Sequence, residues 1–224
     1  MEIFLDTAQV DEIRRAKAWG VVTGVTTNPT LMARAGGDPE TLLKTIAELV
    51  PGPVSAEVIA TDAEGMVREG RHLASLADNI VVKVPMTPAG LEATHRLARE
   101  GIRVNVTLVF QPGQALLAAR AGATFVSPFV GRLDDIGEDG IGLVEEIVAI
   151  FRAQRLSTRV LAASIRHPRH VIGAARVGAD IATMPMAVLE QLMRHPLTDA
   201  GLARFLADWE AVRKGGTEVA AARP

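Results

Sequence analysis

The feature that most constrains the fold is a regular alternation of short β-branched runs with Ala-, Leu-, Arg- and Glu-rich stretches. The short runs predict strands at Ile3–Leu5, Val21–Thr26, Val54–Val58, Ile80–Val84, Arg103–Thr107, Thr124–Ser127, Arg159–Ala163 and Asp180–Thr183. Apolar residues three and four apart predict helices at Ala8–Trp19, Asp38–Leu49, Ala63–Leu76, Thr87–Glu100, Gln111–Ala121, Gly137–Arg155, Pro168–Val177 and Val188–Met193. Such alternation indicates parallel βα units. Eight units in about 200 residues predict an α/β protein with a single (β/α)8 TIM barrel, and an open doubly wound sheet is the alternative.

The C-terminal part of the chain departs from this alternation. Residues 197–214 predict an extra amphipathic helix that carries Phe205, Leu206 and Trp209, and no strand follows it. We therefore expect a barrel over residues 1–196, the extra helix, and a flexible tail over 215–224. The helix either packs on its own barrel or docks on a neighbouring subunit, and the sequence leaves both open.

Composition excludes several classes of protein. The chain has 24 Lys and Arg against 26 Asp and Glu, a net charge of −2, which does not suit a generic binder of nucleic acid or membrane surfaces. It has no run of 18 apolar residues, and Asp6 stands where a signal peptide requires positive charge. We expect a cytoplasmic protein with neither nucleic acid nor membrane as a partner. The lack of cysteine and tyrosine excludes thiol chemistry and a phenolic acid.

Polar residues stand at the carboxyl end of every predicted strand. They are Asp6, Thr26, Thr27, Asn28, Glu57, Lys83, Asn105, Thr107, Ser127, Ser164, Arg166 and Thr183. In (β/α)8 barrels the active site lies at this face, so the sequence predicts the site there.

Lys83 is the most informative of these residues. It lies within the apolar run Ile80–Pro85, of the kind that is buried on both faces in a parallel sheet. A lysine there is costly unless it is paired or neutral, and a neutral buried amine is the nucleophile that Schiff-base chemistry on a ketone requires. The alternative is a lysine at a strand end that reaches a carboxylate.

Asp6 and Glu57 end two other strands and suggest a division of proton transfer. One carboxylate would take and return a substrate proton, and the other would act through water; the alternative for each is a salt bridge to Lys83 or an arginine. Asn105 and Thr107 are two residues apart, so they share one face of a strand and suit the orientation of a polyol.

A phosphate site is predicted at the late strands. Arg132, Ser164 and Arg166 would supply two guanidinium forks and a hydroxyl near a helix N-terminus, although exposed arginines are common in this chain. His167 and His170 lack a carboxylate on a shared helical face, so we expect no metal there. No nucleotide-binding glycine motif is present, and we expect no cofactor.

Five motifs resemble a known family. They are Phe4-Leu5-Asp6-Thr7, Gly24-Val25-Thr26-Thr27-Asn28-Pro29, Ile80-Val81-Val82-Lys83-Val84-Pro85, Ser127-Pro128-Phe129-Val130-Gly131-Arg132 and Ala162-Ala163-Ser164-Ile165-Arg166. In this order they resemble the small-subunit transaldolases, relatives of fructose-6-phosphate aldolase within the class I aldolases. The resemblance implies a (β/α)8 barrel and a homo-oligomer, typically a decamer of two pentamers with the C-terminal helix on a neighbour.

The resemblance also implies roles for single residues. Lys83 would form the Schiff base, Asp6 would deprotonate the C4 hydroxyl, and Glu57 and Thr107 would hold a catalytic water. The implied substrate-binding residues are Asn28 and Asn105 for the dihydroxyacetone unit, Arg132, Ser164 and Arg166 for phosphate, and Thr26, Ser127 and Phe129 beside them.

Two positions favour transfer over cleavage. Fructose-6-phosphate aldolase has Gln at the position of Glu57 and, at that of Phe129, a Tyr that donates a proton; this chain has no Tyr. The resemblance therefore implies transaldolase activity in the pentose phosphate pathway, from sedoheptulose 7-phosphate and glyceraldehyde 3-phosphate to erythrose 4-phosphate and fructose 6-phosphate. The alternatives are aldolase-type cleavage of fructose 6-phosphate and a phosphate-binding barrel without a Schiff base, either an isomerase or epimerase or a ligand binder.

Overall fold

The computed structural model describes residues 1–213, and its first compact unit, Met1–Leu189, is a closed barrel of parallel strands. The strands are β1 (Glu2–Asp6), β2 (Val22–Thr26), β3 (Val54–Glu57), β4 (Ile80–Pro85), β5 (Val104–Val109), β6 (Phe125–Pro128), β7 (Arg159–Ala162) and β8 (Ile181–Met184). Each strand pairs with the next in chain order, and β8 pairs with β1. The predicted (β/α)8 barrel is confirmed, and the open sheet is excluded.

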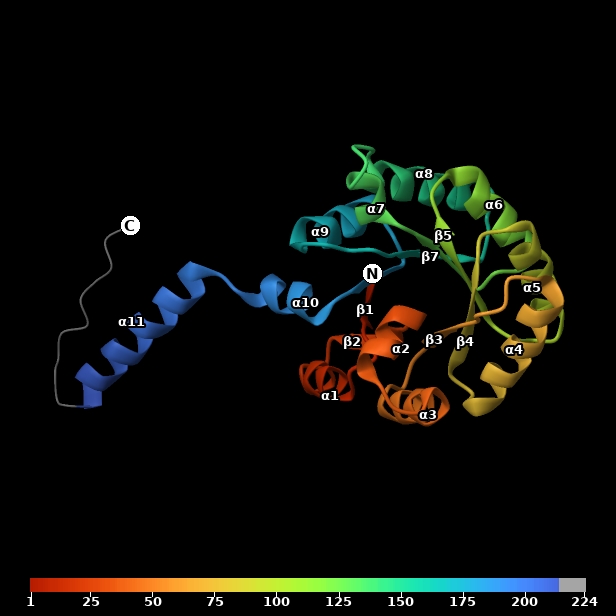
Figure 1. Ribbon diagram of the computed structural model, residues 1–224. Helices are drawn as coiled ribbons and strands as arrows, with labels where there is room; N and C mark the ends of the chain where they lie inside the picture. The colour runs from red at the N-terminus through yellow and green to blue at the C-terminus, as the bar shows by residue number, and fades with distance from the viewer. Residues whose placement is uncertain (214–224) are drawn as a thin grey trace. The chain divides into compact units, whose positions relative to one another are not determined.

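Helices follow the strands and surround them (Figure 1). They are α1 (Val10–Ala18), α2 (Pro29–Ala35), α3 (Pro39–Leu49), α4 (Ala63–Leu76), α5 (Pro88–Arg99), α6 (Pro112–Ala121), α7 (Val130–Asp134), α8 (Gly140–Ala153) and α9 (Pro168–Val177). After β8 the chain continues into α10 (Met186–Met193). Every helix predicted for the barrel is present, with ends shifted by a few residues at most. The helices α2 and α7 were not predicted, and both follow strand ends directly.

These two helices are short and have weak periodicity. In α2 the Asn28 side chain accepts a hydrogen bond from the Leu31 backbone N–H (3.0 Å), and Pro29 occupies the first turn, where its missing N–H is harmless. No residue of α2 is buried, so the apolar spacing that reveals longer helices is lacking. For α2, the capping residue and the proline after it were therefore the only sequence signals of a helix.

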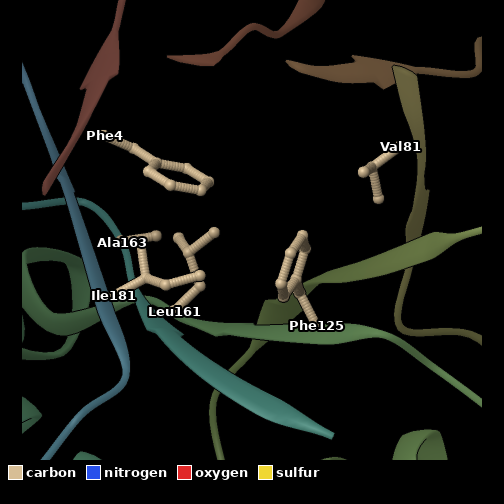
Figure 2. Close-up of a cluster of buried hydrophobic side chains, with 6 residues drawn as sticks. All are labelled: Phe4, Val81, Phe125, Leu161, Ala163 and Ile181. Atoms are coloured by element: carbon tan, nitrogen blue, oxygen red, sulfur yellow. The ribbon is translucent and has the colours of Figure 1, made fainter. Parts of the chain in front are cut away.

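The lower interior of the barrel is filled by apolar side chains. Figure 2 shows Phe4, Val81, Phe125, Leu161, Ala163 and Ile181 pointing into the space that the strands enclose. The rings of Phe4 and Phe125 meet edge to face with their centroids 6.4 Å apart. This packed layer closes the barrel below the polar strand ends.

Gly24 provides room for this layer, and replacing it is our first prediction. A Cβ at Gly24 would lie 2.6 Å from the Phe4 ring, which is buried and cannot move aside freely. We expect Gly24→Ala to lower the free energy of unfolding by about 1–3 kcal/mol, as overpacking does, in urea denaturation. Gly113→Ala in α6 is the control: no atom lies within 4 Å, and alanine favours a helix, so its stability should not fall. Equal stability of the two variants would contradict the packing argument.

The second compact unit is Glu190–Pro224, of which the structure describes residues up to 213. Its main element is α11 (Pro196–Arg213), so the predicted extra helix is present. The predicted tail, 215–224, lies outside the described residues. None of the helices described up to residue 213 is long and apolar enough to cross a membrane.

Candidate active site

The alternation of side chains along each strand places the polar residues above the apolar layer. Phe4, Val81 and Phe125 point into the barrel, and the residues two positions later do the same. Asp6, Lys83 and Ser127 therefore stand at the carboxyl-end face, where barrel enzymes carry their active sites.

Two adjoining cavities open at this face. The first, of about 220 Å³, is lined by Asp6, Thr26, Asn28, Lys83, Asn105, Thr107, Ser127, Phe129, Leu161, Ala163, Ser164, Ile165, Thr183, Arg132 and Arg166. The second, of about 420 Å³, shares Asn28, Lys83, Thr107, Phe129 and Arg132 with it and adds Pro29, Thr30, Leu31, Arg34, Glu57 and Leu108. All the predicted site residues are thus brought together around Lys83, with Glu57 on the side of the second cavity.

Lys83 is held between a carboxylate and a backbone carbonyl. Its side chain is only 7% exposed, and its Nζ lies 3.0 Å from Glu57 Oε2. The same Nζ donates a hydrogen bond to the Thr27 carbonyl oxygen, also at 3.0 Å. The register of β3 and β4 sets Glu57 directly opposite Lys83. The salt bridge considered as an alternative is therefore present, and it also gives the amine an acceptor for its proton.

Asp6 lies in a chain of hydroxyl groups across three strands. Thr26 Oγ1 donates to Asp6 Oδ1 at 2.7 Å and lies 2.6 Å from Thr183 Oγ1. Because Thr26 has one hydroxyl hydrogen, Thr183 donates to Thr26 when Thr26 donates to Asp6. Burial raises the pKa of Asp6, against the opposing effects of the Thr26 hydrogen bond and the Lys83 charge. A raised pKa suits a carboxyl group that takes up and returns a proton during a reaction.

The side chains of Asn105 and Thr107 differ in their hydrogen bonding. The Asn105 amide donates to Ser55 Oγ at 3.2 Å and accepts from Ser127 Oγ at 2.7 Å, which fixes its orientation. Thr107 Oγ1 is buried and has no hydrogen-bond partner among the described residues. A buried hydroxyl that faces a cavity without a partner requires water or substrate to satisfy it.

The first cavity brings together the three residues of the predicted phosphate site. Arg132 belongs to α7, and Ser164 and Arg166 belong to the segment between β7 and α9. The Arg132 guanidinium lies 5.5 Å from the centroid of the Phe129 ring, and Arg166 Nη2 lies 2.9 Å from Asp135 Oδ2. These contacts orient the two arginine side chains, and both residues line the same cavity as Ser164. The arrangement suits a phosphate dianion.

Two backbone segments pack closely together beside this pocket, and one residue there has a strained backbone conformation. The Gly131 N–H donates to the Ser164 carbonyl oxygen at 3.0 Å, and a Cβ at Gly131 would lie 2.3 Å from that oxygen. Ser164 has φ +57°, which is unfavourable for a residue other than glycine. Residues held in such conformations are often found at binding sites, which fits a role of Ser164 in binding.

A buried histidine supports the same segment. His170 Nε2 lies 2.6 Å from Asp134 Oδ2, and His170 Nδ1 accepts a hydrogen bond from the Arg166 backbone N–H at 3.2 Å. Asp134, from α7, approaches His167 as well, a proximity that sequence spacing did not reveal. Both ring nitrogens of His170 are engaged, so the cluster acts as a hydrogen-bonded brace between α7 and Arg166.

Our second prediction concerns the pH dependence that this brace creates. Burial lowers the pKa of His170, against the opposing effect of Asp134, and protonation would break the bond from the Arg166 N–H. The unfolded chain binds this proton more readily, so the contribution to stability is present above about pH 6.5 and is lost as the pH falls. In urea denaturation at about pH 7.5 and 5.5, His170→Leu should show less acid destabilisation than the wild type. His95→Leu, at an exposed site on α5, should retain the full effect.

Several residues that line the cavities had no role predicted from sequence. Leu161, Ala163 and Ile165 are apolar, and strand alternation was their only signal. Thr183 was noted as a polar strand end, and the structure connects it to Asp6 through Thr26. Arg34 belongs to α2, a helix that the periodicity did not predict.

Comparison with known proteins identifies the family. The sequence matches the family described as Transaldolase/Fructose-6-phosphate aldolase over residues 3–217. The chain belongs to this family. A probable transaldolase of Roseiflexus sp. (strain RS-1) is 63% identical over 216 residues, covering 96% of this chain and 100% of that protein. A probable transaldolase of Aquifex aeolicus (strain VF5) is 59% identical over 212 residues, covering 95% and 98%. The resemblance seen in the motifs is confirmed, and the relatives support an enzyme of the transaldolase and aldolase family.

Proposed function

We propose that this enzyme is a transaldolase that transfers a dihydroxyacetone unit between sugar phosphates through a Schiff base on Lys83. The observation that carries the proposal is the buried Lys83 amine at the boundary of two polar cavities, 3.0 Å from Glu57. The donors are sedoheptulose 7-phosphate and fructose 6-phosphate, and the acceptors are the matching aldose phosphates of the pentose phosphate pathway.

The first half of the reaction builds an electron sink. Lys83 passes its extra proton to Glu57, and Nζ then forms a bond to the C2 carbonyl carbon of the ketose. The carbonyl oxygen leaves as water after proton transfers through a water held by Glu57 and the unpartnered Thr107 hydroxyl. Asp6 takes the proton of the C4 hydroxyl, the C3–C4 bond breaks, and its electron pair moves into the iminium. An aldose phosphate leaves, and a three-carbon enamine remains on Lys83.

The second half reverses these steps on another aldehyde. C3 of the enamine attacks the aldehyde carbon of the acceptor, Asp6 returns its proton to the new alkoxide, and water releases the ketose from Lys83. Transfer is favoured over cleavage because Phe129, which lines both cavities, has no hydroxyl to protonate the enamine. The chain has no tyrosine elsewhere to supply one.

Reductive trapping tests the proposal directly. The protein is incubated with fructose 6-phosphate and borohydride, and the intact mass and peptide map are measured. We expect a reduced three-carbon adduct on Lys83, formed when slow protonation of the enamine at C3 by water gives the iminium that borohydride reduces. An unmodified chain, beside a known transaldolase that is modified, would rule out the Schiff base and favour a phosphate-binding barrel of another kind. Release of free dihydroxyacetone at the rate of turnover without an acceptor would favour aldolase activity.

We also propose that the enzyme is a homo-oligomer, a decamer of two pentamers, in which α11 packs on the barrel of a second copy. Leu202, Phe205, Leu206 and Trp209 recur at three- and four-residue spacing on this helix, so they form an apolar stripe that needs a cover. Sedimentation of the wild type and of Phe205→Asp/Trp209→Asp tests this proposal. We expect the variant to dissociate into smaller species; a monomeric wild type would contradict it.

A further inference from the structure

The second cavity contains more positive charge than the expected reaction uses. It is lined by Lys83, Arg34 and Arg132, and by a single carboxylate, that of Glu57. Glu57 is already paired with Lys83 at 3.0 Å. Arg34 and Arg132 therefore line this cavity with no further carboxylate on its wall to balance their charges.

Neither guanidinium is neutralised elsewhere in the described chain. The Arg34 side chain is exposed and makes no ion pair or hydrogen bond with any residue between 1 and 213. Arg132 contacts the Phe129 ring and makes no ion pair with these residues either. Arg166, by contrast, is paired with Asp135. Two unpaired guanidinium forks on one cavity suit a phosphate group, which accepts hydrogen bonds from both.

The position of Arg34 is connected to the reacting centre through α2. Asn28, which lines both cavities, accepts a hydrogen bond from the Leu31 backbone N–H and so begins this helix. Arg34 lies in the last turn of the same helix. A short capped helix thus holds a guanidinium at the wall of a cavity that reaches the Lys83 amine.

We propose that Arg34 is a specificity residue for phosphorylated sugars. Together with Arg132 it binds the phosphate of a sugar phosphate that lies in the second cavity, apart from the pocket of Ser164 and Arg166. The inference rests on the proposed function and adds a second position for the phosphate, with Arg132 common to both positions. The ligand class is an aldose or ketose that carries a terminal phosphate monoester.

Acceptor preference provides the first test. Activity is measured with fructose 6-phosphate as donor and either glyceraldehyde 3-phosphate or glyceraldehyde as acceptor. In Arg34→Met the ratio of the two kcat/KM values should fall by about 10- to 100-fold, the loss typical of a hydrogen bond to a charged group. Arg34→Lys should restore part of the ratio. Arg120→Met, at an exposed arginine of α6 outside both cavities, should leave the ratio unchanged.

A direct binding measurement keeps this inference separate from the proposed function. The affinity for inorganic phosphate, measured by calorimetry, should be lower in Arg34→Met than in Arg120→Met. Trapping of dihydroxyacetone on Lys83 by borohydride needs no phosphate, so it tests the Schiff base alone. A trapped wild type with unchanged acceptor ratio and phosphate affinity in Arg34→Met would overturn the role of Arg34 only. An equal loss with both acceptors would also overturn it, because that indicates displacement of α2.

Discussion

Replacing Lys83 by methionine is expected to reduce transfer activity by about a thousandfold or more, the largest effect of any substitution considered for this enzyme. Methionine retains the length of the side chain and removes the amine, so the C2 carbonyl has no nucleophile to attack it. The other two lysines of the described residues, Lys17 on α1 and Lys44 on α3, line neither cavity, so neither can replace it. The measurement is coupled transfer activity together with borohydride trapping, which should yield no adduct.

Stability must be measured alongside, because the substitution leaves the Glu57 carboxylate without its partner in a mostly buried site. Thermal unfolding of Lys83→Met with and without Glu57→Gln separates the two effects: the second change should recover stability but not activity. Lys17→Met, at an exposed site in the last turn of α1, is the matched control and should keep both activity and trapping. A folded Lys83→Met protein with more than a trace of transfer activity would exclude the Schiff-base assignment.

The barrel could be predicted from sequence because its signals are local and repeated. Each strand is a short run with at least one Val, Ile or Thr. Each long helix has apolar residues on one face, as α3 does with Leu43, Ile46 and Ala47. The helices α2 and α7 escaped prediction because they have only seven and five residues. Apolar periodicity can be recognised only in helices of two or more turns. The short helices beside the site therefore could not be predicted from it.

The site itself was only partly predictable, for a different reason. Strand ends identify which residues face the substrate, since all parallel strands end at one face of the barrel. Contacts between strands depend on register, and no local pattern reveals that Thr26 joins Asp6 to Thr183. The same holds for Asp134, which is 36 residues from His170 and yet accepts its hydrogen bond. The sequence therefore predicted which residues form the site, and the structure was needed to show which of them contact one another.

Asp6→Asn is expected to separate the two halves of the reaction. Asparagine keeps the size of the side chain but cannot take the C4 hydroxyl proton, so transfer should fall by about 10²- to 10⁴-fold. Schiff-base formation uses Lys83, Glu57 and Thr107 instead, so borohydride should still trap added dihydroxyacetone on Lys83 in this variant. Asp11→Asn, which alters an exposed ion pair on α1, is the control for a loss of negative charge and should behave as the wild type.

The pH dependence of kcat provides a second test of the role of Asp6 as the base. Burial raises the pKa of Asp6 above the ordinary aspartate value of about 3.9, and the base is active only when ionised. Activity should therefore fall as the pH decreases through this raised pKa. Thr26→Val removes the hydrogen bond that favours the ionised form, so it should move this acid limb to higher pH. An acid limb that stays in place in Thr26→Val, or that persists in the residual activity of Asp6→Asn, would assign the proton transfer to another group.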